Sequence, residues 1–169
     1  MPTYIKLTQD GLTTVEDPFT FVADDDQYIP PGDVILSLAR FQTDGERLLS
    51  EGRAVGVRVT ADETVESLAY DLPRLSVVAL EFPKFRDGRQ YSNGRLLRER
   101  YGYEGEVRAV GDVLREQAQF MLRCGIDAFE PADGSTPEAW AHAAGRFRHV
   151  YQRAADERVP AFVLRAERQ

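Results

Sequence analysis

Apolar runs that alternate with helical patterns constrain the fold of this chain more than any other feature. Five runs begin about 20 to 30 residues apart, at residues 34–41, 54–60, 76–82, 106–111 and 126–130. Strands that alternate with helices are typical of βαβ units with a parallel sheet and right-handed crossovers. A full (β/α)₈ barrel needs about 250 residues. The pattern therefore predicts an α/β domain of about five mostly parallel strands, either a partial barrel or an open sheet.

The first 33 residues do not follow this pattern. Asp10 and Gly11 form a favoured turn pair between two strand-like segments, which predicts a β-hairpin. An acidic, proline-rich connection follows it at residues 23–32. We therefore predict an N-terminal hairpin and connection over residues 1–33 and a β/α domain over residues 34–169.

Three helices have start signals in the sequence. Ser92 is placed to be the N-cap of a helix that ends at Gly102, and Asp112 to be the N-cap of one that ends at Gly125. The pair Thr136-Pro137 predicts the start of another helix.

The net charge of −7 argues against nucleic acid as a partner, because phosphate backbones require basic surface. The charge is unevenly distributed along the chain. Residues 9–39 contain seven acidic and no basic side chains, whereas basic residues predominate from 84 to 123. Nearly all of the basic residues are arginines, which suit bidentate contacts with carboxylates and other anions.

The sequence contains no signals for membranes, metals or cofactors. It has no secretory leader and no apolar run of membrane-spanning length, which predicts a cytoplasmic protein without a membrane partner. Cys124 is the only cysteine, and His142 and His149 are the only histidines. Neither nucleotide-binding fingerprint is present. We therefore predict no metal site and no cofactor.

The segment at residues 82–92, FPKFRDGRQYS, is the main candidate site. It follows a predicted core strand, and ligands bind outside the carboxyl ends of strands in parallel α/β sheets. It leads into a predicted helix N-terminus, which favours anions. The predicted anion- or partner-binding residues are Lys84, Arg86, Asp87, Arg89, Tyr91 and Ser92. The alternative is a solvated loop with local ion pairs such as Arg86 with Asp87.

Acidic side chains near other strand ends are candidates for acid–base chemistry. Asp112 is either a helix cap or a polar site residue that faces the arginines, and Glu130 follows the last predicted strand. Glu81 lies inside an apolar strand, either on a polar sheet face or buried against an arginine such as Arg108. Trp140 belongs either to the core or to an interface between two copies.

The segments FPKFRDGR and RAVGDVLR, within residues 78–130, resemble a bacterial domain-of-unknown-function family, number nine-three-four. Its members carry the label of an oxidoreductase of sulfite reduction, and their genes lie beside that of assimilatory sulfite reductase. The resemblance covers roughly the C-terminal two-thirds of the chain. This sequence departs from many relatives at Gln90, Asn93 and Gly94.

The resemblance implies a role in sulfite reduction or sulfur assimilation. One cysteine cannot ligate an iron–sulfur cluster, so the sequence favours an accessory protein over an electron carrier. Such a protein would bind sulfite reductase, its electron donor or a small oxyanion through the segment at residues 82–92. The alternatives are an enzyme that acts on a small anionic substrate and a homodimeric scaffold. A concave pocket around the arginines would favour an enzyme, and an exposed surface would favour docking.

Overall fold

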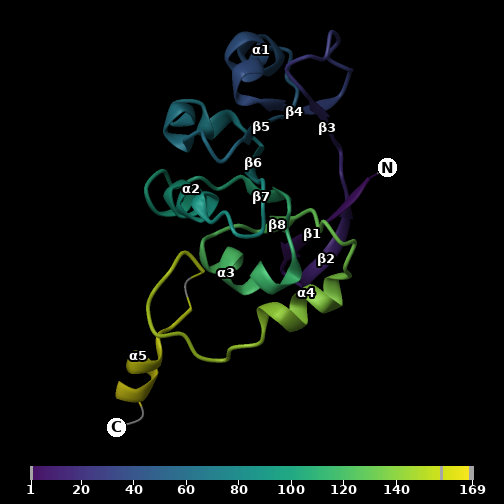
Figure 1. Ribbon diagram of the computed structural model, residues 1–169. Coiled ribbons are helices and arrows are strands. Elements are labelled where there is room, and N and C mark those ends of the chain that lie inside the picture. The colour runs from purple at the N-terminus through teal and green to yellow at the C-terminus, as the bar shows by residue number, and fades with distance from the viewer. Residues whose placement is uncertain (1, 157, 168–169) are drawn as a thin grey trace.

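One eight-stranded sheet organises the chain, in the order β2-β1-β8-β7-β6-β5-β4-β3 (Figure 1). A computed structural model describes residues 2–156 and 158–167. Its strands are β1 (Thr3–Thr8), β2 (Gly11–Glu16), β3 (Phe19–Val22), β4 (Asp33–Ser37), β5 (Val55–Val59), β6 (Val77–Phe82), β7 (Glu106–Gly111) and β8 (Ala128–Phe129). Its α-helices are α1 (Leu38–Ser50), α2 (Arg89–Glu99), α3 (Ala118–Arg123), α4 (Pro137–Ala144) and α5 (Ala161–Ala166).

The predicted parallel sheet and N-terminal hairpin are both confirmed. Strands β3 to β8 are parallel, and β1 pairs with β2 in an antiparallel hairpin whose last pair is Thr8 with Gly11. The sheet is larger than predicted because the hairpin joins it through β1 and β8, while β3 adds a parallel strand at the other edge. The result is a mixed, mostly parallel sheet that curls into a half-barrel.

The first apolar run contains both a strand and a helix, so the prediction of one strand over residues 34–41 is wrong. Strand β4 ends at Ser37, whose hydroxyl caps α1 by accepting a hydrogen bond from the Arg40 main-chain nitrogen at 3.0 Å. Leu38 and Phe41 are buried from the first turns of α1. A short apolar run has no periodicity that separates these two structures, and the serine cap decides where the helix begins.

Two predicted helix starts are also wrong, while the third is confirmed. Helix α2 begins at Arg89, so Ser92 lies inside it. Asp112 does not cap a helix: a short 3₁₀-helix, η3 (Arg115–Gln117), precedes α3. Thr136 is the N-cap of α4, as predicted. Between β5 and β6 the chain forms two 3₁₀-helices, η1 (Val65–Leu68) and η2 (Leu72–Arg74).

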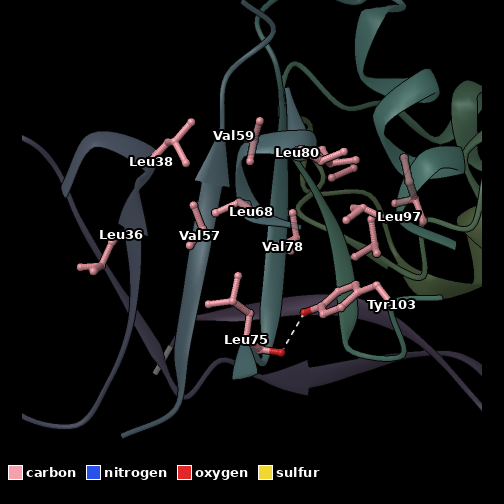
Figure 2. Close-up of a cluster of buried hydrophobic side chains, with 14 of the residues drawn as sticks. Leu36, Leu38, Val57, Val59, Leu68, Leu75, Val78, Leu80, Leu97 and Tyr103 are labelled. Atoms are coloured by element: carbon pink, nitrogen blue, oxygen red, sulfur yellow. Dashed lines mark hydrogen bonds between the residues drawn. The ribbon is translucent and has the colours of Figure 1, made fainter. Parts of the chain in front are cut away.

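Helices cover one face of the sheet, and the main core lies beneath them (Figure 1). Leu36, Val57 and Val78 occupy one register on neighbouring strands and are fully buried. Figure 2 shows this cluster with Tyr103, whose hydroxyl donates a hydrogen bond to the Leu75 carbonyl oxygen at 3.1 Å. Continuous apolar runs are typical of parallel strands whose two faces are both covered.

The opposite face of the sheet is covered by the N-terminal segment. Only Asp17 and Pro18 lie between β2 and β3, and this short connection joins the two edges of the curled sheet beside this face. Phe19 packs there against a small apolar cluster of Ile35, Val77, Ala79 and Val110. We call residues 16–19 the strap.

None of the helices in the described residues is long and apolar enough to cross a lipid bilayer.

Candidate functional site

The connection between β6 and α2 forms a tight loop at the carboxyl end of the sheet. Asp87 donates its main-chain N–H to the Lys84 carbonyl oxygen at 2.9 Å, which closes a turn. The Asp112 carboxylate accepts the main-chain N–H of Phe85 at 2.7 Å. Asp112 therefore anchors the loop that was predicted to carry function, and it does so from the end of the neighbouring strand, β7.

Arg89 is largely neutralised by two carboxylates. Its Nε and Nη2 atoms lie 2.9 and 2.6 Å from the two oxygens of Asp87, and its Nη1 atom contacts Asp62. Asp87 also accepts the main-chain N–H of Arg89 and thereby caps α2. These hydrogen bonds from Arg89 lower the pKa of Asp87 to about 2. The local ion pair of this loop joins Asp87 to Arg89, and Arg86 takes no part in it.

Lys84 and Arg86 are the exposed cations of the loop. Within residues 2–156 and 158–167, neither of them forms an ion pair. Phe85, which lies between them, is 45% exposed. Two free cations on either side of an exposed aromatic ring favour contact with an acidic and partly apolar surface.

Tyr91 links this loop to the core and to α3. Its ring packs edge-on against buried Phe82 at 5.2 Å and against Phe120 at 4.7 Å. Burial raises the pKa of Tyr91, and its hydroxyl accepts a hydrogen bond from Gln117 at 3.2 Å. Ser92 is exposed on α2, one turn beyond the position that would cap the helix.

Buried Gln117 brings the loop and α3 together. Its Nε2 atom donates to the Phe85 carbonyl oxygen at 3.4 Å and to the Tyr91 hydroxyl, while its Oε1 atom accepts the Leu114 main-chain N–H. Phe120, one helical turn further along, is 57% exposed. We call the surface formed by Lys84, Phe85, Arg86 and Phe120 the aromatic–basic patch.

The other predicted acidic residues lie on the strap-covered face of the sheet, away from this loop. Glu130 lies 3.2 Å from Arg108. Glu81 pairs with Arg58 on β5 at 3.0 Å, so the suggested pair with Arg108 is wrong. Glu81 and Arg58 face the same side of neighbouring parallel strands, and the Arg58 guanidinium stacks on exposed Phe21, 4.7 Å from the ring centre.

Arg108 is the centre of a buried ionic network that sequence reasoning missed. Its side chain is fully buried and contacts Glu106 on its own strand at 2.7 Å and Asp17 of the strap at 2.6 Å. The Tyr4 ring lies 3.8 Å from the guanidinium, and the Tyr4 hydroxyl donates to Glu106 at 2.8 Å. Lys6 completes the network with a 2.7 Å contact to Glu106. With these partners in place, the network clamps the strap onto the sheet.

Charge and hydrogen bonding determine the ionisation of Glu106. Burial by itself would raise the pKa of this carboxyl group, but Arg108, Lys6 and Tyr4 outweigh burial and hold the pKa below its ordinary value. Burial and the hydrogen bond to Glu106 raise the pKa of Tyr4. The alternation of Glu106 and Arg108 on one face of a strand was the only sequence signal for this network.

A cavity of about 620 Å³ lies at the opposite, amino end of β7 and β8. Its lining includes Arg98, Asp127 and Arg158 and none of the residues of the loop at 82–92. Lining residues come from six separate parts of the chain, so no local sequence motif could have revealed the cavity. The arginines of the candidate loop therefore lie outside it.

His, Cys, Asp and Glu side chains are the usual metal ligands in proteins. Residues 2–156 and 158–167 contain no group of three His, Cys, Asp or Glu side chains arranged to hold a metal ion. Cys124 is half-buried, and burial raises the pKa of its thiol, which disfavours the reactive thiolate. His142 and His149 are both exposed.

These features define an α/β half-barrel protein with an aromatic–basic patch at the carboxyl end of its sheet and a buried ionic clamp beneath its strap. Residues 56–162 match the model of a family described as a bacterial protein of unknown function, DUF934. Because this match spans more than half of the chain, the protein belongs to that family. The resemblance seen in residues 78–130 is thereby confirmed. A comparison with curated proteins finds no match.

Proposed function

We propose that the chain is an accessory protein of sulfite reduction that docks on an acidic surface of sulfite reductase through the aromatic–basic patch. The pathway comes from the family resemblance of residues 78–130. The mode of action rests on one observation, the exposure of Lys84, Phe85 and Arg86 on an anchored loop at the carboxyl end of the sheet.

The aromatic–basic patch is held in place by hydrogen bonds and stacking, which supports a docking role. The Phe85 main chain is held on both sides, by Asp112 at its N–H and by Gln117 at its carbonyl oxygen. Stacking of Phe82, Tyr91 and Phe120 connects the patch to the core. A surface that is already ordered loses little conformational entropy on binding, and exposed aromatic rings beside cations are typical of interface anchors.

Charge also supports docking. The chain has a net charge of −7, so Lys84 and Arg86 form a local positive region on an acidic molecule. Such a region steers an acidic partner toward one face and increases the association rate at low ionic strength. Arg89 contributes little because Asp87 and Asp62 already balance its charge.

The alternative of an enzyme receives less support from the geometry. Asp112 is occupied with the main chain of Phe85, and Glu130 lies beside Arg108 on the other side of the sheet. The 620 Å³ cavity is lined by neither of these carboxylates and by none of the loop arginines. A catalytic acid or base needs to reach a substrate held in a concave site.

Growth and binding together test the proposal. A deletion strain is expected to grow on sulfide but poorly on sulfate or sulfite, and the double variant Lys84→Glu/Arg86→Glu should fail to restore growth. In vitro, the variant should bind purified sulfite reductase at least about tenfold more weakly, with the loss concentrated in the association rate.

Arg148→Glu/Arg153→Glu is the matched control because it reverses two exposed cations elsewhere on the chain. It should behave like wild type in both assays. Equal weakening by the two double variants would reject a specific patch and leave only an effect of net charge. Normal growth of the deletion strain on all three sulfur sources would reject the role in sulfite reduction.

A further inference from the structure

The 620 Å³ cavity at the amino end of β7 and β8 is separate from the aromatic–basic patch. Its volume lies within the usual range of small-molecule sites. It opens on the end of the sheet opposite the aromatic–basic patch, since Asp127 precedes β8 and Glu104 precedes β7.

Hydrogen bonds hold two lining residues of the cavity, Arg98 and Asp127, in place. Arg98 donates to the carbonyl oxygens of Gly125 and Gly105 at 2.9 and 2.8 Å, and its Nη2 atom lies 3.0 Å from Asp127. Asp127 in turn accepts the Val107 main-chain N–H at 2.9 Å. The charges of Arg98 and Asp127 therefore balance each other.

A second ion pair positions the segment that carries Ala155, Asp156 and Arg158. Arg123 at the end of α3 lies 3.1 Å from Asp156, and both side chains are largely buried. Arg123 also donates to the Gln152 carbonyl oxygen at 2.7 Å. This pair fixes the chain that brings Ala155 and Arg158 to the cavity, and it leaves no free charge on Asp156.

Glu104 and Arg158 are the two remaining charged residues of the lining. Arg158 donates from Nη2 to the carbonyl oxygens of Phe147 and Arg148, each at 2.9 Å, and pairs with no carboxylate among the described residues. Glu104 has no ion pair in the same part of the chain, so the two opposite charges line one cavity without contacting each other. Such an arrangement matches a ligand that carries one charge of each sign.

Apart from Gln119, the uncharged lining residues of the cavity are apolar or glycine. Leu122, Ile126 and Ala144 line the cavity between the charged groups. Burial raises the pKa of Asp127, another lining residue.

We infer that this cavity binds a short zwitterion with an apolar body, an α-amino acid or a dipeptide. Glu104 contacts the ammonium group of the ligand, Arg158 contacts its carboxylate, and Leu122 and Ala144 contact its side chain.

Calorimetric titration of the full-length protein with L-leucine and with leucyl-alanine tests the inference at pH 7.5. Two analogues of leucine each lack one charge: isoamylamine has no carboxylate, and 4-methylpentanoate has no amine. The zwitterion should bind at least about tenfold more tightly than either analogue, because each loses one charge-assisted contact. Tighter binding of leucine would indicate an amino acid as the ligand, and tighter binding of leucyl-alanine would indicate a dipeptide.

Two variants test which residue contacts the amine of the ligand and which contacts its carboxylate. In Glu104→Gln, leucine and 4-methylpentanoate should bind equally, because the amine no longer gains from a carboxylate. In Arg158→Gln, leucine and isoamylamine should bind equally. Arg115→Gln, at an exposed arginine outside the lining, should leave all affinities unchanged.

The wild-type protein alone can overturn the inference. Absence of saturable binding of both zwitterions at about 10 mM would reject it, because a dissociation constant above that value is too weak for a specific site. Equal binding of leucine and its two singly charged analogues would also reject it, because apolar contact alone would then explain the binding.

Discussion

Glu16 is the last residue of β2 and Phe19 is the first residue of β3, yet their strands lie at opposite edges of an eight-stranded sheet. Neighbouring strands lie about 4.8 Å apart, so the edges of a flat sheet of this size would be roughly 34 Å apart. The three peptide units from Glu16 to Phe19 span at most about 11 Å. The sheet therefore curls until its two edges approach each other, and the strap closes the open side of the half-barrel.

Arg108 should be essential for holding this strap. Replacement by Ala leaves buried Glu106 and strap residue Asp17 without their shared guanidinium. Removal of one partner from a buried ionic network typically costs about 3–5 kcal/mol of unfolding free energy. Urea denaturation followed by circular dichroism measures this loss for Arg108→Ala.

Arg58→Ala is the control for this variant. Arg58 also lies on the strap-covered face and pairs with Glu81, but both side chains are partly exposed. Solvent-accessible pairs contribute about 1 kcal/mol or less, so this variant should lose far less stability. Equal losses for the two variants would show that the buried network has no special role in the fold.

Glu106 should make the stability of the protein depend on pH in the acidic range. Its pKa in the folded protein lies below the ordinary value of 4.5, because Arg108, Lys6 and Tyr4 outweigh the effect of burial. The ionised form therefore stabilises the fold, and this contribution is complete above pH 4.5. It is lost as the pH falls through the folded-state pKa.

Comparison with Glu106→Gln isolates this contribution from other carboxyl groups. The variant should be less stable than wild type at neutral pH, and the difference in unfolding free energy should shrink steadily below pH 4.5. Chemical denaturation at several pH values between about 3 and 7 gives this difference. A constant difference over the whole range would contradict the assigned pKa direction.

The sequence predicted the strands, turn and helix start that depend on residues close together in the chain. Alternating apolar runs predicted the parallel strands, Asp10-Gly11 predicted the hairpin, and Thr136 predicted the start of α4. The start of α2 was misplaced because Gly88 and Asp87 together supply the cap that Ser92 was expected to provide. In α2 the Asp87 carboxylate accepts the N–H of Arg89, the first helical residue, whereas the prediction assigned a capping role to the Ser92 hydroxyl.

Long-range relationships were beyond the reach of sequence patterns. Arg108 contacts Asp17 from 91 positions away in the chain, and Tyr4 contacts Glu106 from 102 positions away. Neither pair exists until the hairpin joins the far edge of the sheet through β8. For the same reason, the candidate loop was located correctly at the carboxyl end of β6, but the neutralisation of Arg89 by Asp62 was not foreseen.

Trp140 should contribute to stability from the core, where it is fully buried against Phe129 with ring centres 4.6 Å apart. Its indole N–H donates to the Ser135 hydroxyl at 2.8 Å. Trp140→Ala should therefore lower the unfolding free energy by about 3–5 kcal/mol. Circular dichroism is the suitable probe, because Trp140 is the only tryptophan and the variant has no indole fluorescence.

Phe147→Ala provides the comparison for Trp140, because Phe147 is 59% exposed. Its unfolding free energy should stay within about 0.5 kcal/mol of wild type. Sedimentation of both variants at several concentrations tests the homodimer alternative as well. A dimer that dissociates in Trp140→Ala, without loss of monomer stability, would place Trp140 in an interface and contradict its assignment to the core.

Arg89 should control the ionisation of Asp87 in the candidate loop. Hydrogen bonds from the Arg89 side chain and main chain hold the pKa of Asp87 at about 2, below the ordinary value of 3.8. In Arg89→Gln the pKa should rise toward 3.8, because the guanidinium contacts are gone while the main-chain N–H remains. Carbon-13 NMR of the Asp87 carboxyl during an acid titration measures the change directly.

Asp62→Asn is the control for this variant. It should leave the pKa of Asp87 near 2, because Asp62 contacts Nη1 of Arg89 and not Asp87 itself. A large rise in Asp62→Asn would mean that Asp62, and not the direct pair, holds Arg89 in place.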